Sequence, residues 1–285
     1  GYNYLASASI PDGNTIVIKD HSDNTVSSPN YIIRRGGSPS QIDQEVASFG
    51  TDDSPIMYED IEASVNSHPW FYQVEALDSC KRSILFSNVV ETVFLEGEAI
   101  DESTNRLRWN TPEGWAEGIA RFEVYRKLPS EAGFVLLSEL SSTETDYEDS
   151  WIGLNPDEFY GSVYQLAAVQ NDGNPYGYQE KSFSNHVILE RTIQLNMPNA
   201  FRPDSDIEVN RLFKPKFSYK EVQSYEMRIY NRWGQLVFET NNVEEGWDGT
   251  FNGSKAPAGA YNYVVRYEDQ NGMVVEKAGM VVLVR

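Results

Sequence analysis

Residues 260–267 read Ala-Tyr-Asn-Tyr-Val-Val-Arg-Tyr, and an aromatic or aliphatic side chain returns at every second position. The alternation places Tyr261, Tyr263, Val265 and Tyr267 on one face of an extended strand, because successive side chains of a β-strand point to opposite faces. An amphipathic α-helix would instead repeat its apolar side chains every three and four residues. The stretch therefore predicts a β-strand with one buried face.

A hairpin with the same period precedes this strand. Residues 224–231 alternate in the same way, residues 232–235 read Arg-Trp-Gly-Gln and predict a turn, and residues 236–239 form the returning strand. Asn-Gly at positions 271–272 is typical of a type I′ turn and predicts a further hairpin. The strand that follows, residues 273–285, is so apolar that we expect it to be paired or covered.

The composition extends this expectation to the whole chain. Of the 285 residues, 13% are aromatic, which favours strands over helices, and convincing helical periodicity is absent. Residues 1–94 carry 5 basic and 13 acidic residues, residues 95–190 carry 6 and 18, and residues 191–285 carry 12 and 12. An acidic surface repels phosphate groups, so nucleic acids and anionic lipids are poor partner candidates for this chain. The change near residue 190 predicts a different role for the last third.

The first two thirds contain a divergent internal repeat of about 90–95 residues. Four short stretches return in the same order at offsets of 89 to 97 residues. They are residues 31–35 and 122–126, residues 58–60 and 147–149, residues 72–76 and 164–168, and residues 86–88 and 183–185. Short strands bounded by turn residues in a unit of this length predict an immunoglobulin-like sandwich.

The second copy resembles a fibronectin type III domain. In that family Trp109 would be the buried core tryptophan of an early strand, and Tyr164 the tyrosine of a late strand. The first copy departs from the pattern, because its early strand, residues 15–19, has no tryptophan. We predict an all-β chain of tandem sandwiches, with fibronectin-like domains over residues 1–94 and 95–190 and a third sandwich over residues 191–285.

The third domain carries four further motifs. In order they are residues 198–203 (Pro-Asn-Ala-Phe-Arg-Pro), residues 229–238 (Ile-Tyr-Asn-Arg-Trp-Gly-Gln-Leu-Val-Phe), residues 246–250 (Gly-Trp-Asp-Gly-Thr) and residues 257–265 (Pro-Ala-Gly-Ala-Tyr-Asn-Tyr-Val-Val). With these motifs the segment resembles the gliding-motility-associated C-terminal domain of Bacteroidota, the type B sorting domain of type IX secretion substrates. The resemblance implies a sorting and partner-binding site. Its candidate residues are Tyr230, Asn231, Arg232, Trp233, Gly234, Gly246, Trp247, Asp248, Gly249, Tyr261 and Tyr263.

The residues of these motifs also have structural interpretations of their own. Gly234 suits a tight turn at positive φ. Trp233 beside it is expected to cap one end of the sandwich, and Asp248 to bond nearby backbone N–H groups while Trp247 buries its ring. Burial habits favour a structural role for both tryptophans over a ligand-binding one.

The resemblance also implies a location and partners. The chain would be the C-terminal part of a large secreted cell-surface protein, an adhesin or a gliding-associated protein, with its secretion signal peptide upstream of residue 1. It would pass through the type IX translocon, stay attached to the outer membrane, and dock on an outer-membrane β-barrel partner of the PorP/SprF type with its sorting domain retained. Two alternatives stay open: a ligand- or glycan-binding module on the fibronectin-like domains, and the tail of an upstream secreted enzyme.

No catalytic motif or cofactor-binding motif is present in the sequence, and we predict that the chain itself is not an enzyme. No apolar run approaches the roughly 18 residues of a membrane-spanning helix. The family's glycine-containing opening loop is replaced by residues 204–210, where Asp204, Asp206 and Asn210 offer oxygen ligands for Ca²⁺. Their spacing does not match an EF-hand loop, and a solvated acidic loop is the competing interpretation.

Overall fold

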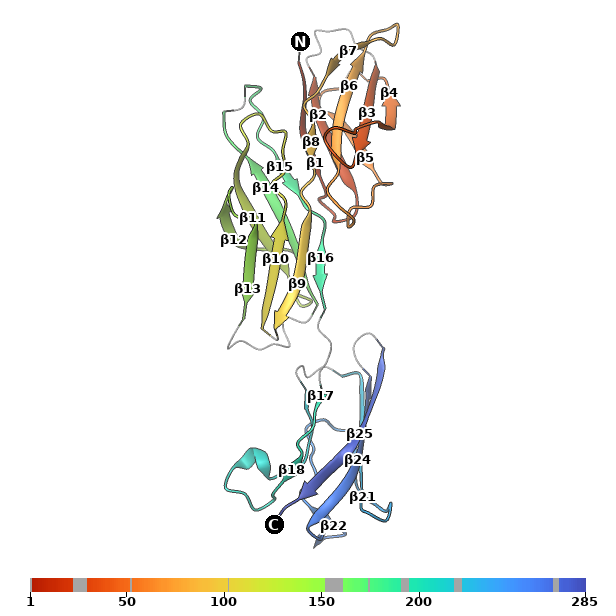
Figure 1. The fold of residues 1–285 in the computed structure, drawn as a ribbon, viewed down its shortest axis with the longest axis vertical. Coiled ribbons are helices and arrows are strands. Elements are labelled where there is room, and N and C mark those ends of the chain that lie inside the picture. The colour runs from red at the N-terminus through yellow and green to blue at the C-terminus, as the bar shows by residue number, and fades with distance from the viewer. Residues whose placement is uncertain are drawn as a thin grey trace. The chain divides into compact units, whose positions relative to one another are not determined.

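The structure is a computed structural model, and nearly every element in its described part is a β-strand (Figure 1). The residues described are 2–22, 30–51, 53–101, 103–151, 161–173, 175–190, 195–217, 222–268 and 272–285. The chain divides into two compact units, Gly1–Glu190 and Arg191–Arg285. The predicted all-β architecture is confirmed.

The first half of the first unit is a sandwich of two antiparallel sheets. One sheet has the order β1 (Asn3–Ser9), β2 (Ile16–Ser22), β5 (Ile56–Asp60). The other has the order β4 (Gln44–Phe49), β3 (Asn30–Gly36), β6 (Phe71–Leu77), β7 (Ser83–Phe86), and β8 (Val90–Glu91) also pairs with β6. Alternate apolar side chains of the two sheets meet in one core.

The second half repeats this strand pattern. Its first sheet has the order β9 (Leu95–Asp101), β10 (Thr104–Trp109), β13 (Asp146–Ser150). Its second has the order β12 (Val135–Ser141), β11 (Ile119–Lys127), β14 (Ser162–Gln170), β15 (Lys181–Phe183), and β16 (Val187–Leu189) also pairs with β14. Trp109 and Tyr164 are both buried, as the fibronectin-like pattern predicts.

The residues of the internal repeat form the same buried network in each sandwich. In the first, Asp60 accepts hydrogen bonds from Arg35 (2.7 Å) and from the Tyr72 hydroxyl (2.8 Å). The second has the same arrangement: Asp149 accepts from Arg126 (2.6 Å) and from the Tyr164 hydroxyl (2.7 Å). In each case the aspartate stands on one sheet and its two partners are paired neighbours on the other. The network ties the two sheets together, which explains why these short stretches repeat.

Residues 86–88 and 183–185, another pair of stretches of the internal repeat, anchor the first strand of each sandwich. The side-chain oxygen of Asn88 accepts a hydrogen bond from the backbone N–H of Leu5, and its amide donates back to the Leu5 carbonyl. Asn185 makes the same two bonds with Leu95. Each amide therefore replaces a missing backbone partner at the start of a sheet.

The two sandwiches share one continuous core rather than meeting through a bare linker. The buried indole of Trp115 donates to the carbonyl of Ala6 (2.9 Å), and Asn88 donates to the carbonyl of Gly114 (2.7 Å). The backbone N–H of Ile10 donates to the carbonyl of Phe183 (2.8 Å). Residues 1–190 therefore form a single compact unit, and its division into domains near residue 94 stays a prediction.

The second unit is built on a five-stranded sheet. Its order is β18 (Ala200–Phe201), β25 (Val274–Leu283), β24 (Gly259–Glu268), β20 (Ser224–Tyr230), β21 (Leu236–Thr240). The pair β17 (Leu195–Asn196) and β19 (Lys216–Phe217), the hairpin β22 (Thr250–Phe251) and β23 (Ser254–Lys255), and the 3₁₀ turn η2 (Glu208–Asn210) complete it. The alternating strand at 260–267 and the hairpin at 224–239 are both confirmed.

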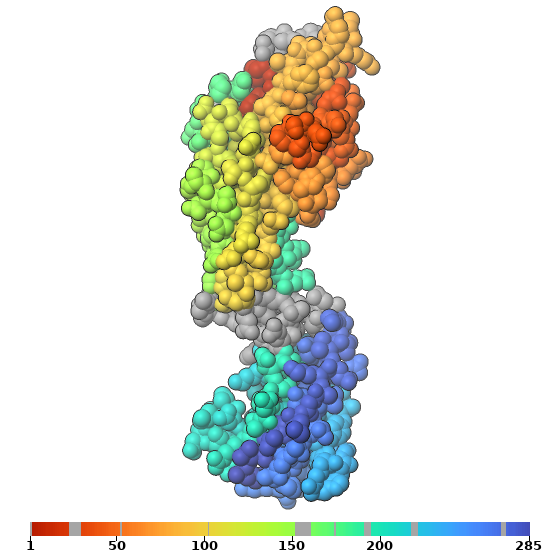
Figure 2. All heavy atoms as spheres, in the orientation of Figure 1, coloured from red at the N-terminus to blue at the C-terminus, as the bar shows by residue number. Residues whose placement is uncertain are grey.

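The apolar C-terminal strand is paired as expected. β25 lies antiparallel to β24 along its whole length and parallel to the short β18 at its end, and Figure 2 shows it in the darkest blue at the surface of this unit. Gly272 has φ +77°, whereas Asn271, the other residue of the predicted type I′ turn, lies outside the described residues.

Aromatic rings fill the core of the second unit. Trp247 is 0% exposed, its backbone exchanges two hydrogen bonds with Phe213, and its indole donates to the carbonyl of Thr250 (2.7 Å). Its ring centroid lies 4.6 Å from that of Tyr261 and 5.3 Å from that of Phe201. The predicted structural role of Trp247 is confirmed.

Candidate functional site

The turn between β20 and β21 is held by one asparagine side chain. The side-chain oxygen of Asn231 accepts hydrogen bonds from the backbone N–H groups of Trp233 and Gln235, both at 3.0 Å. The backbone N–H of Gly234 donates to the Asn231 carbonyl (2.9 Å), and Gly234 has φ +80°, a region that glycine enters without steric cost. The turn is therefore fixed by its own residues.

This fixed turn projects two large side chains into solvent. Trp233 is 74% exposed, so the expectation that it caps an end of the sandwich is wrong. The guanidinium carbon of Arg232 stands 4.1 Å from the centroid of the Trp233 ring, a cation–π contact that orders both side chains. The indole of Trp233 therefore lies outside the core of this unit, to which Trp247 belongs.

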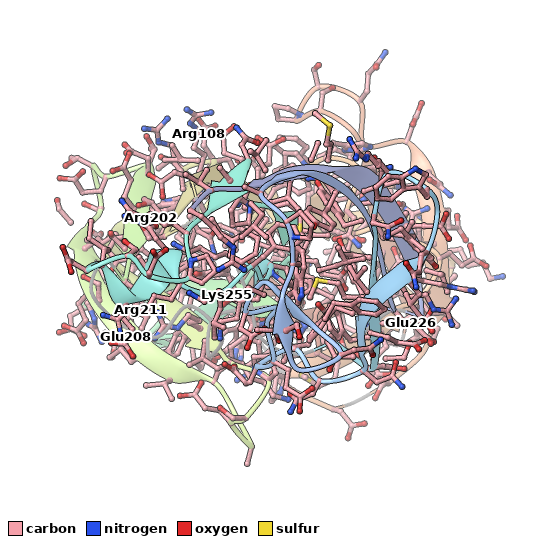
Figure 3. The ribbon with its side chains drawn as sticks, turned by 90° about the horizontal axis from the view of Figure 1, so that it is seen from below. Arg108, Arg202, Glu208, Arg211, Glu226 and Lys255 are labelled. Carbon is pink, nitrogen blue, oxygen red and sulfur yellow. The ribbon has the colours of Figure 1, made fainter. Side chains whose placement is uncertain are left out.

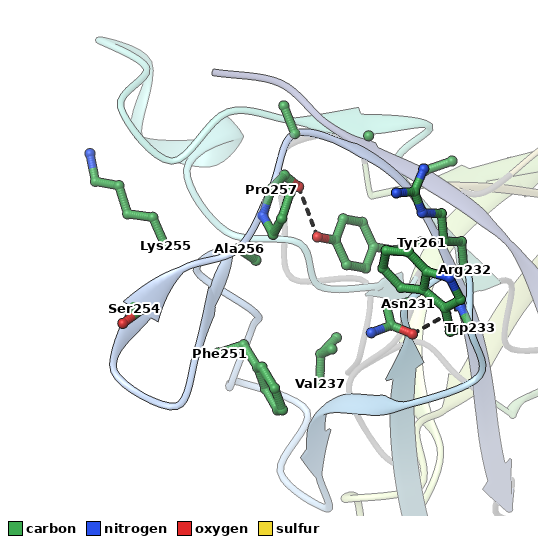
Figure 4. Close-up of a pocket in the computed structure, with 13 residues that line it drawn as sticks. Asn231, Arg232, Trp233, Val237, Phe251, Ser254, Lys255, Ala256, Pro257 and Tyr261 are labelled. Atoms are coloured by element: carbon green, nitrogen blue, oxygen red, sulfur yellow. Dashed lines mark hydrogen bonds between the residues drawn. The ribbon is translucent and has the colours of Figure 1, made fainter.

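A second segment faces the turn and completes a hollow. Segment 256–260 precedes and opens strand β24, and the hydroxyl of Tyr261 donates to the carbonyl of Pro257 (2.8 Å). Gly259 has φ +145°, outside the range that other residues adopt easily. The space between residues 231–233 and this segment has a volume of about 460 Å³, within the range of small ligand pockets (Figure 4). We call it the Trp233 hollow.

The turn after β21 fixes the hairpin and the segment that form one wall of the Trp233 hollow. The carboxylate of Asp248 accepts bonds from the backbone N–H and the hydroxyl of Thr250 (2.9 and 2.7 Å), which confirms the predicted Asx-type turn. Gly249 has φ +74°, and its carbonyl accepts bonds from the backbone of Ala256 (2.9 Å) and the guanidinium of Arg285 (2.8 Å). These bonds fix the β22–β23 hairpin against segment 256–260.

Two cationic side chains and one partly buried phenol set the electrostatics of the Trp233 hollow. Its lining includes the cationic side chains of Arg232 and Lys255 and contains no aspartate or glutamate. Burial raises the pKa of the Tyr261 phenol, and the nearby guanidinium groups of Arg285 and Arg232 act in the opposite direction. The surface is therefore locally positive in a chain that carries 43 acidic and 23 basic residues.

With this geometry in view, comparison with known proteins decides the nature of the second unit. Residues 195–283 match the family model of the CHU_C type IX secretion signal domain. This part of the chain is a type IX secretion signal domain. Such a domain implies secretion to the cell surface or the extracellular space, and interaction with the type IX secretion machinery. No curated protein matches the chain.

Three solved structures are similar to parts of the chain at low identity. They are pectate lyase Pel3 from Pectobacterium carotovorum (18% identity, 39% of this chain and 34% of that chain, TM-score 0.27), a tetra-tandem repeat from the extending region of a large adhesion protein (13%, 99% and 73%, 0.32), and a two-domain fibronectin type III segment of chicken tenascin (13%, 66% and 97%, 0.25). At these TM-scores none of them carries an argument about function. The match to the pectate lyase spans only about a third of that chain.

The predicted motif residues of the secretion signal domain separate into two groups. The first group lines the Trp233 hollow: Asn231, Arg232, Trp233 and Tyr261. The second group builds the supporting turns, strands and core: Tyr230, Gly234, Gly246, Trp247, Asp248, Gly249 and Tyr263. A Cβ on Gly246 would lie 3.0 Å from the Leu212 Cβ, so that glycine allows close packing.

Several lining residues of the secretion signal domain were not singled out from the sequence. They are Val237, Phe251, Ser254, Lys255, Ala256, Pro257, Ala258, Gly259 and Ala260. The motif at 257–265 contains four of them, so it could have indicated this wall. Phe251, Ser254 and Lys255 belong to a short hairpin whose Asn252-Gly253 turn, with φ values of 49° and 73°, was an available signal.

The acidic loop of the secretion signal domain is a separate feature. Asp204, Asp206 and Asn210 are all exposed, and Asp204 stands 3.5 Å from Arg202. Arg202, Glu208 and Arg211 mark this side of the domain in Figure 3. Within the described ranges, no group of three or more His, Cys, Asp or Glu side chains is placed to hold a metal ion. Calcium binding by the three predicted ligands stays a prediction.

The length and hydropathy of the helices bear on whether one of them could cross a membrane. Among the helices of the described residues, none has the length and hydropathy that a membrane crossing requires.

Proposed function

We propose that the chain is part of a large secreted cell-surface protein, an adhesin or a gliding-associated protein. In this proposal, residues 195–283 direct it through the type IX translocon and then dock it on an outer-membrane β-barrel partner of the PorP/SprF type. The domain stays on the mature protein and attaches it to the outer membrane. The family match supports the secretion step, and the surface described above supports the docking step.

The observation that carries the docking proposal is the exposure of Trp233. An indole that is 74% exposed on a turn fixed by Asn231 leaves a large apolar surface in water. Exposed tryptophan beside arginine, next to a hollow, has the composition of a binding hot spot. The second tryptophan of the domain, Trp247, is fully buried, so exposure is not a general property of its aromatic residues.

In the same proposal, residues 1–190 act as an acidic spacer that carries upstream modules. The shared core and the bonds of Trp115 and Asn88 across the two sandwiches make this unit a stiff body. Its surplus of acidic residues favours solubility and repels phosphate-bearing surfaces. We propose no catalytic role for this chain.

Export of the chain tests the proposal. In a bacterium with a type IX system, and with the same secretion signal peptide fused before residue 1 of each chain, we expect residues 1–285 to reach the cell surface and a chain ending at Glu190 to stay inside the outer membrane. Trp233→Ala is expected to release the exported protein from the cells, whereas Met280→Ala, which removes another side chain that is 59% exposed but lies outside the hollow, should leave it attached. Efficient surface display of the shortened chain would contradict the sorting role, and mature protein ending near residue 190 would contradict retention.

A ligand-binding role for the first unit stays an alternative prediction. Its most evident aromatic cluster joins the two sandwiches: Tyr4 stacks on Tyr176 with centroids 4.6 Å apart, and His21 stacks on Tyr178 at 3.6 Å. These rings contact one another across the two halves, so they support the stiffness of the unit more directly than recognition of a glycan.

A further inference from the structure

The charge of the Trp233 hollow differs from that of the rest of the chain. Its 13 lining residues include Arg232 and Lys255 and no acidic residue, although residues 191–285 carry 12 basic and 12 acidic residues. Both cationic side chains are exposed, and neither takes part in the ion pairs of the described residues. An unpaired cation beside a hollow is available to an anionic partner.

The two cations lie on opposite sides of an apolar centre. Figure 4 shows Lys255 at one side of the hollow and Arg232 at the other, with Pro257, Tyr261, Phe251 and Val237 between them. A volume of about 460 Å³ accepts one large side chain together with part of its backbone. This arrangement is complementary to an apolar side chain that has a negative charge on either side.

We propose that the Trp233 hollow binds an extended acidic segment of the outer-membrane partner protein. One aromatic or large aliphatic side chain of that segment fills the hollow, beside the indole of Trp233. Carboxylates two residues before and two residues after it face Arg232 and Lys255, because side chains at i and i±2 share one face of an extended strand. This inference rests on the proposed docking function and names the chemistry of the partner.

Binding of short peptides to the full 285-residue chain tests the inference. The probe is the acetylated and amidated heptapeptide Ser-Asp-Ser-Phe-Ser-Asp-Ser, and the readout is the indole N–H signal of Trp233 in a ¹⁵N-labelled sample, assigned by its loss in Trp233→Phe. We expect the signal to shift on titration. Peptides with Asn for both Asp residues, or with Ala for Phe, should bind at least about fivefold more weakly, as lost charge pairs and lost ring burial require.

Variants of the protein give the second arm. Arg232→Gln and Lys255→Gln should each weaken the acidic peptide about three- to tenfold and leave the neutral peptide unchanged. Arg266→Gln removes an equal charge from an exposed position of β24 outside the hollow, and should change neither. Equal binding of the acidic and neutral peptides, or equal effects of Arg266→Gln and Arg232→Gln, would overturn the inference.

A lipid or a second copy of the chain bound in the Trp233 hollow would give different experimental results. If vesicles of phosphatidylcholine with 30% phosphatidylglycerol bind the chain and Arg232→Gln abolishes this, while the peptide causes no shift, the hollow recognises a lipid and the inference is wrong. If the chain self-associates in sedimentation velocity runs and Arg232→Gln makes it monomeric, the occupant is a second copy of the chain, which also overturns the inference.

Failure of the inference and failure of the proposed function can be told apart. Capture of an outer-membrane β-barrel protein that requires residues 191–285 but is unchanged by Arg232→Gln with Lys255→Gln would keep the docking function and reject this hollow. Capture that does not require residues 191–285 would reject the docking function, whatever the peptides show.

Discussion

Replacement of Asp20 by asparagine should stabilise the first unit at neutral pH. Asp20 stands two residues beyond Ile18, which pairs with Tyr58, and Trp109 stands two residues beyond Leu107, which pairs with Tyr147. Asp20 therefore takes the place of the core tryptophan in the first sandwich. It is 0% exposed, and neither of its carboxylate oxygens has a hydrogen-bond partner among the described residues.

The expected change in the free energy of unfolding follows from the buried environment of Asp20. A buried polar group without a partner costs about 1–3 kcal/mol, and more when it is charged. Burial raises the pKa of Asp20 well above its ordinary value, so the folded chain binds a proton more tightly than the unfolded chain. The destabilisation is thus absent below the unfolded pKa and grows as pH rises from that value towards the folded pKa. Asparagine keeps a neutral polar group at this site but cannot ionise, so we expect Asp20→Asn to raise the free energy of unfolding at pH 7 by the additional cost of the buried charge, about 1–3 kcal/mol.

Urea unfolding between pH 3.5 and pH 8, followed by tryptophan fluorescence, measures this difference. The stability curves of the natural chain and of Asp20→Asn should converge at the acid end and separate as pH rises. Asp12→Asn is the matched control, because burial raises the pKa of the Asp12 carboxyl but the backbone hydrogen bonds from Asn14 and Thr15 together outweigh it and hold the pKa below its ordinary value. Asp12→Asn removes this hydrogen-bonded carboxylate and should therefore lower the free energy of unfolding at pH values above the pKa of Asp12 in the unfolded chain. Equal stability of Asp20→Asn and the natural chain at pH 7 would show that the buried Asp20 carboxylate does not destabilise the first unit.

Three further substitutions probe packing. Trp247→Ala should destabilise the second unit by about 3–5 kcal/mol, because it empties the centre of the core, and calorimetry should show the loss of that unit's transition with the first unit unchanged. Gly279→Ala should cost about 1–3 kcal/mol, since its Cβ would lie 2.4 Å from the hydroxyl oxygen of Tyr263, and an unchanged urea midpoint would contradict this close approach. Trp115→Phe removes the hydrogen bond to the carbonyl of Ala6 and should cost about 0.5–1.5 kcal/mol, with faster amide exchange where β1 meets the second sandwich as the test.

Much of the fold could be predicted because strand formation leaves a local signal. The period of two at residues 260–267 identifies β24 and its buried face, and the offsets of the internal repeat identify two sandwiches with one strand pattern. The bonding of Asp60 and Asp149 could not be read in this way. Each aspartate meets its arginine and tyrosine across two sheets, and that distance depends on how the sheets pack.

The candidate site was predictable in part for the same reason. Asn231, Gly234 and Asp248 form turns from neighbouring residues, and the sequence contains all the partners that these turns need. The outward direction of Trp233 depends on how the turn fixed by the two hydrogen bonds of Asn231 is placed on the sheet, which its local sequence does not determine. The position of Lys255 in the wall of the hollow could not be predicted, because the fold must first bring together residues 231–233 and a segment about 20 residues later in the sequence.

Co-purification with outer-membrane proteins tests whether residues 191–285 contain the docking surface. A tagged chain of residues 1–285, its Trp233→Ala variant and a chain ending at Glu190 would each be purified and incubated in equal amounts with solubilised outer membranes of a bacterium that has a type IX system. We expect a β-barrel protein of the PorP/SprF type to accompany the full chain, to be strongly reduced with Trp233→Ala, and to be absent with the shortened chain. Equal recovery of that protein with all three chains would contradict the account, because the docking surface would then lie within residues 1–190.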